Sequence, residues 1–171
     1  NTVINGIGRK NSHCFSLCNI VMDLDMHAKM HEYDRHEMIN EFVWYFERDL
    51  VSAGLVPPPN MYHYTGRGLQ IWWSLQETSA KLAFVYRDLI RYFALIIKQL
   101  LTDHPELEQY IDIDTDSSKR LSGLFRLVNT YNSHTGLKTN FEILHDSHYD
   151  INELKTSLEA NDVVAAYLEG K

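Results

Sequence analysis

Ile20-Val21-Met22-Asp23-Leu24-Asp25 is the most informative stretch of the chain. Its apolar and β-branched residues predict a buried strand over residues 16–24. Successive side chains of a strand point to opposite faces of the sheet. Met22 and Leu24 should therefore share one face, and Asp23 and Asp25 should share the other.

Two carboxylates side by side at the end of a buried strand repel each other, and desolvation adds to the cost of keeping both charged. A bound cation would offset both effects. Mg²⁺ and Mn²⁺ are the natural candidates, because these hard ions prefer carboxylate oxygens. The alternative is a strand that runs out into solvent with Asp23 and Asp25 both hydrated.

Length and composition predict a single soluble domain. The 171 residues, 44% of them hydrophobic, are enough to build one sizeable core. No apolar run reaches membrane-spanning length, and no segment reads as a signal peptide. Two cysteines indicate a reducing compartment, so we expect a cytoplasmic protein. Because residue 1 is Asn, we expect residues 1–171 to be a single domain excised from a longer protein.

The net charge of −7 argues against binding nucleic acid by bulk electrostatic attraction. It leaves room for a local basic groove, because the middle of the chain holds many of the cations. These are Arg67, Lys81, Arg87, Arg91, Lys119, Arg120, Arg126 and Lys138.

The order of predicted elements is mixed and does not follow a regular βαβ alternation. A helix is expected behind the capping-box pair Asp34 and Glu37, and a second helical region behind Asp150 and Glu153. The expected class is α+β, with a mixed or antiparallel sheet flanked by long helices. The remaining expected elements are strands at 61–64, 69–75, 110–114, 124–128 and 141–144, a long helix at 77–103, and a helical C-terminal appendage at 146–171.

A turn at residues 65–68 carries two glycines around Arg67. Glycines let backbone N–H groups approach an anion closely, and arginine can add a bidentate phosphate contact. The strand that follows should point Gln70 to the same surface. The alternative is an ordinary hairpin turn whose arginine is merely solvated.

The stretch Tyr110-Ile111-Asp112-Ile113-Asp114-Thr115-Asp116 reads as a short strand that ends in acidic residues. An aspartate at this strand end could supply a third carboxylate to a metal site. The alternative is an acidic surface loop followed by an ordinary hairpin. The chain continues as Arg126-Leu127-Val128-Asn129-Thr130-Tyr131-Asn132-Ser133-His134-Thr135-Gly136.

These segments, in this order, resemble the archaeo-eukaryotic primase superfamily over about residues 16–145. The closest similarity is to the primase-polymerase domains of bacterial plasmids, phages and integrative elements. Asp23 and Asp25 would form the first motif and residues 65–70 the second. Asp114 would be the third, with Asp112 and Asp116 as alternative registers. Residues 126–136 resemble the R-L-P-G-T-x-N-x-K-T-G run that often follows.

The resemblance implies an RRM-like primase core and a DNA-dependent nucleotidyltransferase that makes primers in mobile-element replication. Two Mg²⁺ or Mn²⁺ ions would be its cofactors. Its partners would be a single-stranded DNA template, an NTP or dNTP, and a helicase or other replication protein, with no membrane. Asp23, Asp25 and Asp114 would be both catalytic and metal-binding. The implied nucleotide-binding residues are Thr65, Gly66, Arg67, Gly68, Gln70, Arg126 and Asn132.

The sequence departs from the family pattern at two places. The second motif usually ends in a histidine that contacts phosphate, whereas this chain has Gln70, which carries no positive charge. Val128-Asn129 replaces the usual Pro-Gly. Two other function classes therefore stay open: a non-catalytic nucleic-acid or replisome-interaction module on the same fold, and an unrelated metal-dependent phosphohydrolase.

Overall fold

A six-stranded sheet forms the centre of the computed structural model, which describes residues 2–3, 14–26, 32–118 and 130–170. The strand order is β1-β2-β4-β3-β6, and β5 pairs with β2. Each of these pairings is antiparallel. The strands are β1 Thr2–Val3, β2 Cys14–Met26, β3 Met61–Tyr64, β4 Gly68–Ser79, β5 Ile111–Ile113 and β6 Asn140–Ile143.

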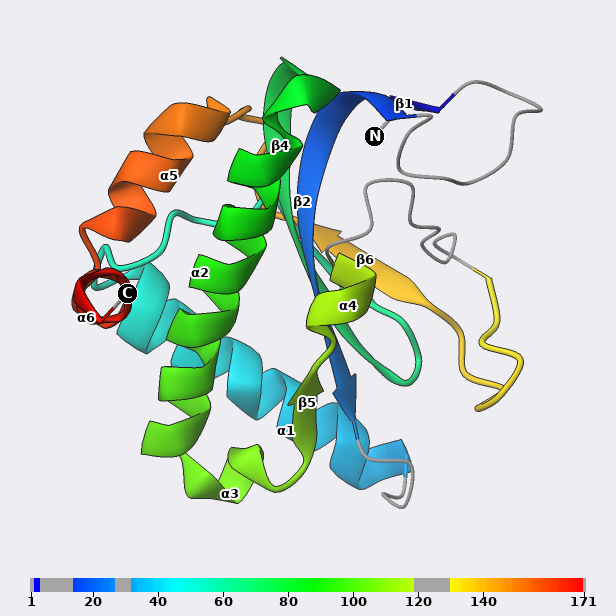
Figure 1. Cartoon of the computed structure of the whole chain (residues 1–171). Coiled ribbons are helices and arrows are strands. Elements are labelled where there is room, and N and C mark those ends of the chain that lie inside the picture. The colour runs from blue at the N-terminus through cyan, green and yellow to red at the C-terminus, as the bar shows by residue number, and fades with distance from the viewer. Residues whose placement is uncertain (1, 4–13, 27–31, 119–129, 171) are drawn as a thin grey trace.

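The long helices lie on one side of this sheet, which confirms the predicted α+β class (Figure 1). Helix α2 runs along the central strands, and α5 packs on α2. The helical elements are α1 Glu32–Tyr45, the π-helix η2 Phe46–Val51, the 3₁₀ turn η3 Ala80–Leu82, α2 Ala83–Asp103, α3 Pro105–Glu108, α4 Thr115–Ser118, α5 Ile151–Glu159 and α6 Asp162–Glu169.

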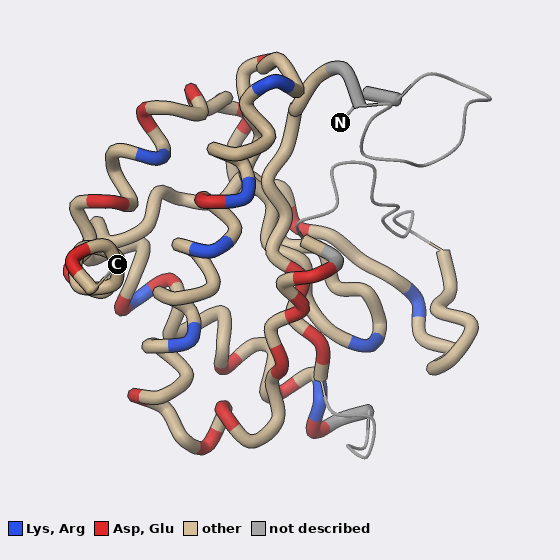
Figure 2. Tube along the Cα trace, in the orientation of Figure 1, with Lys and Arg blue, Asp and Glu red and all other residues tan. Residues whose placement is uncertain are grey.

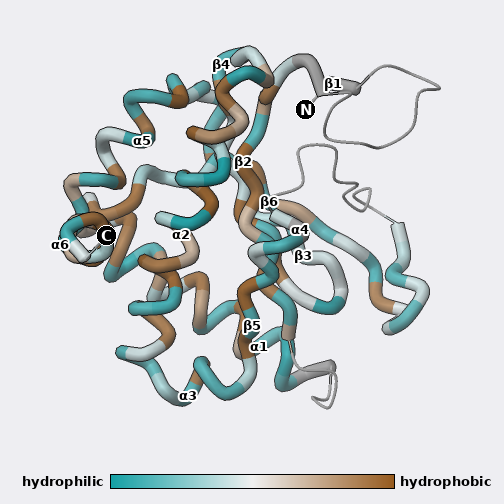
Figure 3. Tube along the Cα trace, viewed as in Figure 1, coloured by the Kyte–Doolittle hydropathy of each residue, from teal (hydrophilic) through white to brown (hydrophobic). Residues whose placement is uncertain are grey.

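The predicted alternation along β2 is confirmed, because Met22 and Leu24 are buried whereas Asp23 and Asp25 are partly exposed. On β4 the buried Trp73 stacks on Phe93 of α2 with ring centroids 4.0 Å apart. Hydrophobic residues run along both α2 and the central strands in Figure 3. Burying large side chains in this layer is the main source of stability of the fold.

Several predicted boundaries were wrong. Strand β4 continues to Ser79, because Thr78 and Ser79 pair with β2, so the long helix begins at Ala83 instead of residue 77. Asp34 lies inside α1 and does not cap it. Asp150 does cap α5, since its side chain accepts hydrogen bonds from the amides of Asn152 and Glu153. The strand predicted at 124–128 falls outside the described residues.

In the part of the chain that the structure describes, no helix combines the length and the apolar character needed to cross a bilayer. The C-terminal helices contribute to the same core as the sheet. Leu154 and Leu158 of α5 and Val164 of α6 are all buried in it.

Candidate active site

Four aspartates from β2, β5 and the residue after β5 lie on the sheet face opposite the long helices. Asp25 of β2 pairs with Asp112 of β5. One step further along, the Asp114 amide donates to the Asp23 carbonyl over 2.8 Å. Directly paired residues of an antiparallel ladder point to the same face, so Asp112 and Asp114 join Asp23 and Asp25 there. Figure 2 shows acidic residues gathered where β2, β5 and α4 meet.

Burial and the neighbouring acids perturb the carboxyl group of Asp23. Burial raises the pKa of Asp23 to about 6, and repulsion from Asp25 and then Asp114 adds to the increase. A hydrogen bond from Gln70 and the charge of Arg67 lower the pKa of Asp23 but do not cancel the increase. A carboxyl group with a raised pKa in a polar cluster is typical of functional sites.

Asp114 is held by the short helix α4. Its Oδ1 accepts a hydrogen bond from the Asp116 amide at 3.1 Å, and its carbonyl accepts one from the Ser118 hydroxyl at 2.8 Å. The same hydroxyl accepts from the Asp23 amide at 3.1 Å. Ser118, which is fully buried, therefore ties α4 to β2 beside the aspartates. Asp112 and Asp116 are exposed.

The β3–β4 turn brings Arg67 to the aspartates. Gly66 adopts φ +76°, a left-handed conformation that glycine accepts without strain. The Thr65 hydroxyl accepts from the amides of Arg67 and Gly68 at 3.4 and 3.0 Å. Those two amides are thus engaged within the turn. Arg67 instead faces Asp25, with 3.5 Å between Nε and Oδ1.

Gly68 is required where β4 passes β2. A Cβ atom at Gly68 would lie 2.0 Å from the Leu24 carbonyl oxygen, so strand and turn would have to move apart. We expect Gly68→Ala to lower the free energy of unfolding by about 1–3 kcal/mol, the usual cost of overpacking. Urea denaturation measures this. Gly170→Ala is the control, because a Cβ there meets its nearest atom at 3.6 Å; equal losses in both variants would contradict the explanation.

Gln70 is buried between Asp23 and His63, its neighbours on the two adjoining strands. Its Oε1 lies 2.9 Å from His63 Nδ1, and it also bonds the Asp23 side chain. An ionised carboxylate only accepts, so the Gln70 NH₂ group must face Asp23 and Oε1 must face His63. His63 therefore carries a proton on Nδ1. Gln70 acts here as a support for Asp23.

The loop at residues 130–139, which precedes β6, contacts the turn at residues 65–68 through Asn132. The side chain of the buried Asn132 donates from Nδ2 to the Thr65 carbonyl at 3.0 Å. The backbone amide of Asn132 donates to the Leu137 carbonyl at 2.7 Å. Asn132 thus holds the turn that carries Arg67. Arg126, predicted to bind nucleotide, lies outside the described residues.

The donor set suits a hard divalent cation in kind, because it consists of carboxylate oxygens whose repulsion such an ion would relieve. The carboxylates are not, however, arranged as a closed set of ligands. Among the described residues, no three His, Cys, Asp or Glu side chains are placed to hold one ion together. Arg67 is the cation found next to Asp25.

His63 and Ser118 are site residues that the sequence interpretation missed. A signal existed for His63: a hairpin with its turn at residues 65–68 places residue 63 opposite residue 70. No comparable signal existed for Ser118, since its contact with β2 depends on how α4 packs.

Compared by sequence, the chain matches no family model and none of the curated proteins. Compared by structure, it is similar to the AEP domain of the cyanophage S-2L primase-polymerase (PrimPol). The TM-score is 0.54 at 16% sequence identity, and the match covers 91% of this chain and 68% of that one. Structural similarity at 16% identity establishes the fold but not the reaction, which has to be argued from the residues of the site. The chain has an archaeo-eukaryotic primase-type fold.

Proposed function

We propose that the chain is a DNA-dependent nucleotidyltransferase, a primase or primase-polymerase that serves the replication of a mobile element. The observation that carries the proposal is the meeting of Asp23, Asp25 and Asp114 on one face of a primase-type sheet. Crowded carboxylates are costly to a fold, and a protein that only binds nucleic acid has little use for them.

Asp23, Asp25 and Asp114 would hold two Mg²⁺ or Mn²⁺ ions. When bound, such ions activate an attacking hydroxyl and stabilise the leaving oxygen of a phosphoryl transfer. Arg67 lies beside the aspartates, where its guanidinium group could leave Asp25 and bind the phosphates of an incoming NTP or dNTP instead. Gln70, fixed by His63, orients the Asp23 carboxylate. A single-stranded DNA template would lie across this face, and a helicase or other replication protein would be a further partner.

The test is incorporation of labelled nucleotide on a single-stranded template with Mn²⁺. We expect Asp114→Asn to abolish incorporation, because it removes the carboxylate next to Asp23. Asp116→Asn is the matched control, since Asp116 is an exposed acid two residues further along, and it should keep wild-type activity. Equal activities of the two variants would overturn the assignment of Asp114.

A non-catalytic nucleic-acid module on the same fold is the second candidate. Gln70 favours it, because a neutral, buried amide stands where the family usually has a phosphate-binding histidine. In this case the wild-type chain would shift single-stranded DNA in a gel, incorporate no nucleotide with Mg²⁺ or Mn²⁺, and show the same DNA affinity in Asp114→Asn.

A further inference from the structure

The loop at residues 130–139 folds back on itself as a short antiparallel ladder. Two backbone hydrogen bonds of 2.7 Å close it, from the amide of Asn132 to the carbonyl of Leu137 and from the amide of Thr139 to the carbonyl of Thr130. Between these bonds, Tyr131 pairs with Lys138. Because this pair lies between the bonds and takes no part in them, its two side chains stand close together on one face of the ladder.

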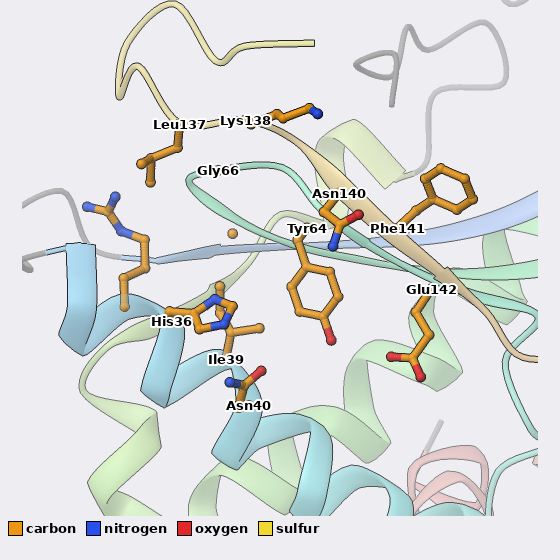
Figure 4. A pocket seen from close by; sticks show the side chains of 12 residues that line it. His36, Ile39, Asn40, Tyr64, Gly66, Leu137, Lys138, Asn140, Phe141 and Glu142 are labelled. Atoms are coloured by element: carbon orange, nitrogen blue, oxygen red, sulfur yellow. The ribbon is translucent and has the colours of Figure 1, made fainter. Parts of the chain in front are cut away.

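The other face of the ladder is fixed to the protein. Asn132 and Thr139 are buried, and Leu137 points into a cavity of about 670 Å³ between α1 and β6 (Figure 4). Lys138 points away from that cavity and is exposed, and Tyr131 is 69% exposed. The loop therefore presents an aromatic ring and a cation side by side to solvent, on a backbone that is held from behind.

The charge around Tyr131 and Lys138 is unlike that of the chain as a whole. The net charge of the chain is −7, yet residues 130–141 contain no Asp or Glu, and Figure 2 shows no acidic residue along this loop. A local surface with a cation and without acids can attract a polyanion in spite of the net charge. An exposed tyrosine adds a ring on which a base of any type can stack. Together they suit a single strand of nucleic acid, whose bases are available for stacking.

The loop lies directly against the turn that carries Arg67. The Asn132 side chain donates to the Thr65 carbonyl at 3.0 Å, and a Cβ atom on Gly66 would lie 3.1 Å from the Leu137 Cβ. The same turn places Arg67 next to Asp25. A strand held on the loop would therefore pass beside the aspartates, which is where a template has to lie.

We propose that Tyr131 and Lys138 bind the single-stranded DNA template. One base stacks on the ring of Tyr131, and the ammonium group of Lys138 contacts a neighbouring phosphate. The inference rests on the proposed function only in naming this strand the template. The contact itself needs no metal ion and no nucleotide, so it can be measured apart from nucleotidyl transfer.

Fluorescence anisotropy of a labelled oligodeoxythymidine, titrated with the whole chain in EDTA, tests the stacking contact. Tyr131→Ala should raise the Kd by about 5–150-fold, the usual effect of losing one base–aromatic stack. Tyr131→Phe should bind like the wild type, because it keeps the ring. The matched control is Phe84→Ala, which removes another exposed aromatic side chain, 61% exposed at the start of α2, and should leave the Kd unchanged.

The salt dependence of the same titration tests the phosphate contact. Lys138→Ala should weaken binding and reduce the slope of log Kd against log salt concentration by about 0.7, the value for one phosphate contact on a single strand. Tyr131→Ala should leave the slope unchanged. Lys98→Ala removes an exposed lysine of α2 and should change neither the Kd nor the slope.

Three results would overturn the proposal: no measurable binding of single-stranded DNA by the wild type, equal Kd values for Tyr131→Ala and Phe84→Ala, or equal losses in Tyr131→Ala and Tyr131→Phe. An unchanged slope in Lys138→Ala would overturn the phosphate contact. A wild-type chain that showed the expected DNA binding but incorporated no nucleotide with Mn²⁺ would support this DNA contact and remove only the proposed transfer. Incorporation by a chain whose DNA affinity ignored Tyr131 would do the reverse.

Discussion

Replacing Asp23 by asparagine is expected to abolish Mn²⁺-dependent nucleotide incorporation while making the metal-free protein more stable near pH 7.5. Activity should fall by more than the roughly 10–100-fold that loss of a group supporting a metal ligand costs. Stability should rise because burial penalises the charged carboxylate of Asp23, and because the neutral amide also ends its repulsion by Asp25 and Asp114. The substituted side chain keeps an oxygen that can accept from Gln70.

The stability gain should depend on pH in a defined direction. The Asp23 carboxyl has a pKa of about 6 in the folded chain, above the value of about 3.9 for an unfolded one. Between these values the folded state binds more protons, so the wild-type free energy of unfolding falls as pH rises through 6. The full cost above pH 7 is about 2–3 kcal/mol, and it vanishes below about pH 4.

Urea denaturation of both proteins in EDTA, from pH 4 to pH 8, measures this effect. The curves of wild type and Asp23→Asn should converge below about pH 4, separate between pH 4 and pH 6, and run parallel above about pH 7. Asp116→Asn is the control and should follow the wild type. A large loss of stability in Asp23→Asn at every pH would show that Asp23 is a structural, hydrogen-bonded group and would remove the metal-site interpretation.

Loss of Arg67 is expected to weaken nucleotide binding with little change in stability. An arginine that contacts phosphates contributes roughly 1.5–3 kcal/mol, so Arg67→Ala should raise the Kd of a dNTP by about 10–150-fold in the presence of Mn²⁺. The free energy of unfolding should change by less than about 1 kcal/mol, because Arg67 and Asp25 form a half-exposed ion pair. Fluorescence titration with a labelled dNTP gives the Kd.

Arg91→Ala is the matched control. Arg91 forms an equally exposed pair with Asp88 on α2, where Nη1 and Oδ1 are 3.6 Å apart. It should leave the Kd unchanged. If Arg67→Ala bound nucleotide as tightly as Arg91→Ala, the turn would be only a hairpin, and the proposed function would rest on the aspartates alone.

Gln70 illustrates how the structure changes an expectation from the sequence. The resemblance suggested that Gln70 stands where a histidine usually contacts a phosphate. In the structure Gln70 is 5% exposed and bonds both Asp23 and His63. A histidine at position 70 would lie next to the imidazole of His63. It could bond both Asp23 and His63 only if its ring N–H pointed toward the Asp23 carboxylate. We therefore expect the main effect of Gln70→His to be a change in the orientation of Asp23.

Local patterns were sufficient for what depends on neighbours in the chain. The alternation in residues 20–25 correctly placed Met22 and Leu24 in the core and Asp23 and Asp25 on the other face, because strand side chains have a fixed period of two. The glycines around Arg67 likewise predicted the β3–β4 turn. Boundaries such as the start of α2 were missed, because β4 is prolonged by pairing with β2, a distant segment.

Contacts between distant segments decided the rest, and no periodicity records them. The sequence left Asp112, Asp114 and Asp116 as alternatives for the third carboxylate. The pairing of β5 with β2 and the hydrogen bonds of the Ser118 hydroxyl hold Asp114 beside Asp23. The raised pKa of Asp23 follows from that packing, since burial and converging charges exist only in the folded chain. The cavity between α1 and β6 also arises only there. The sequence by itself determined which residues lie on each face of a strand, and tertiary packing decided which faces meet.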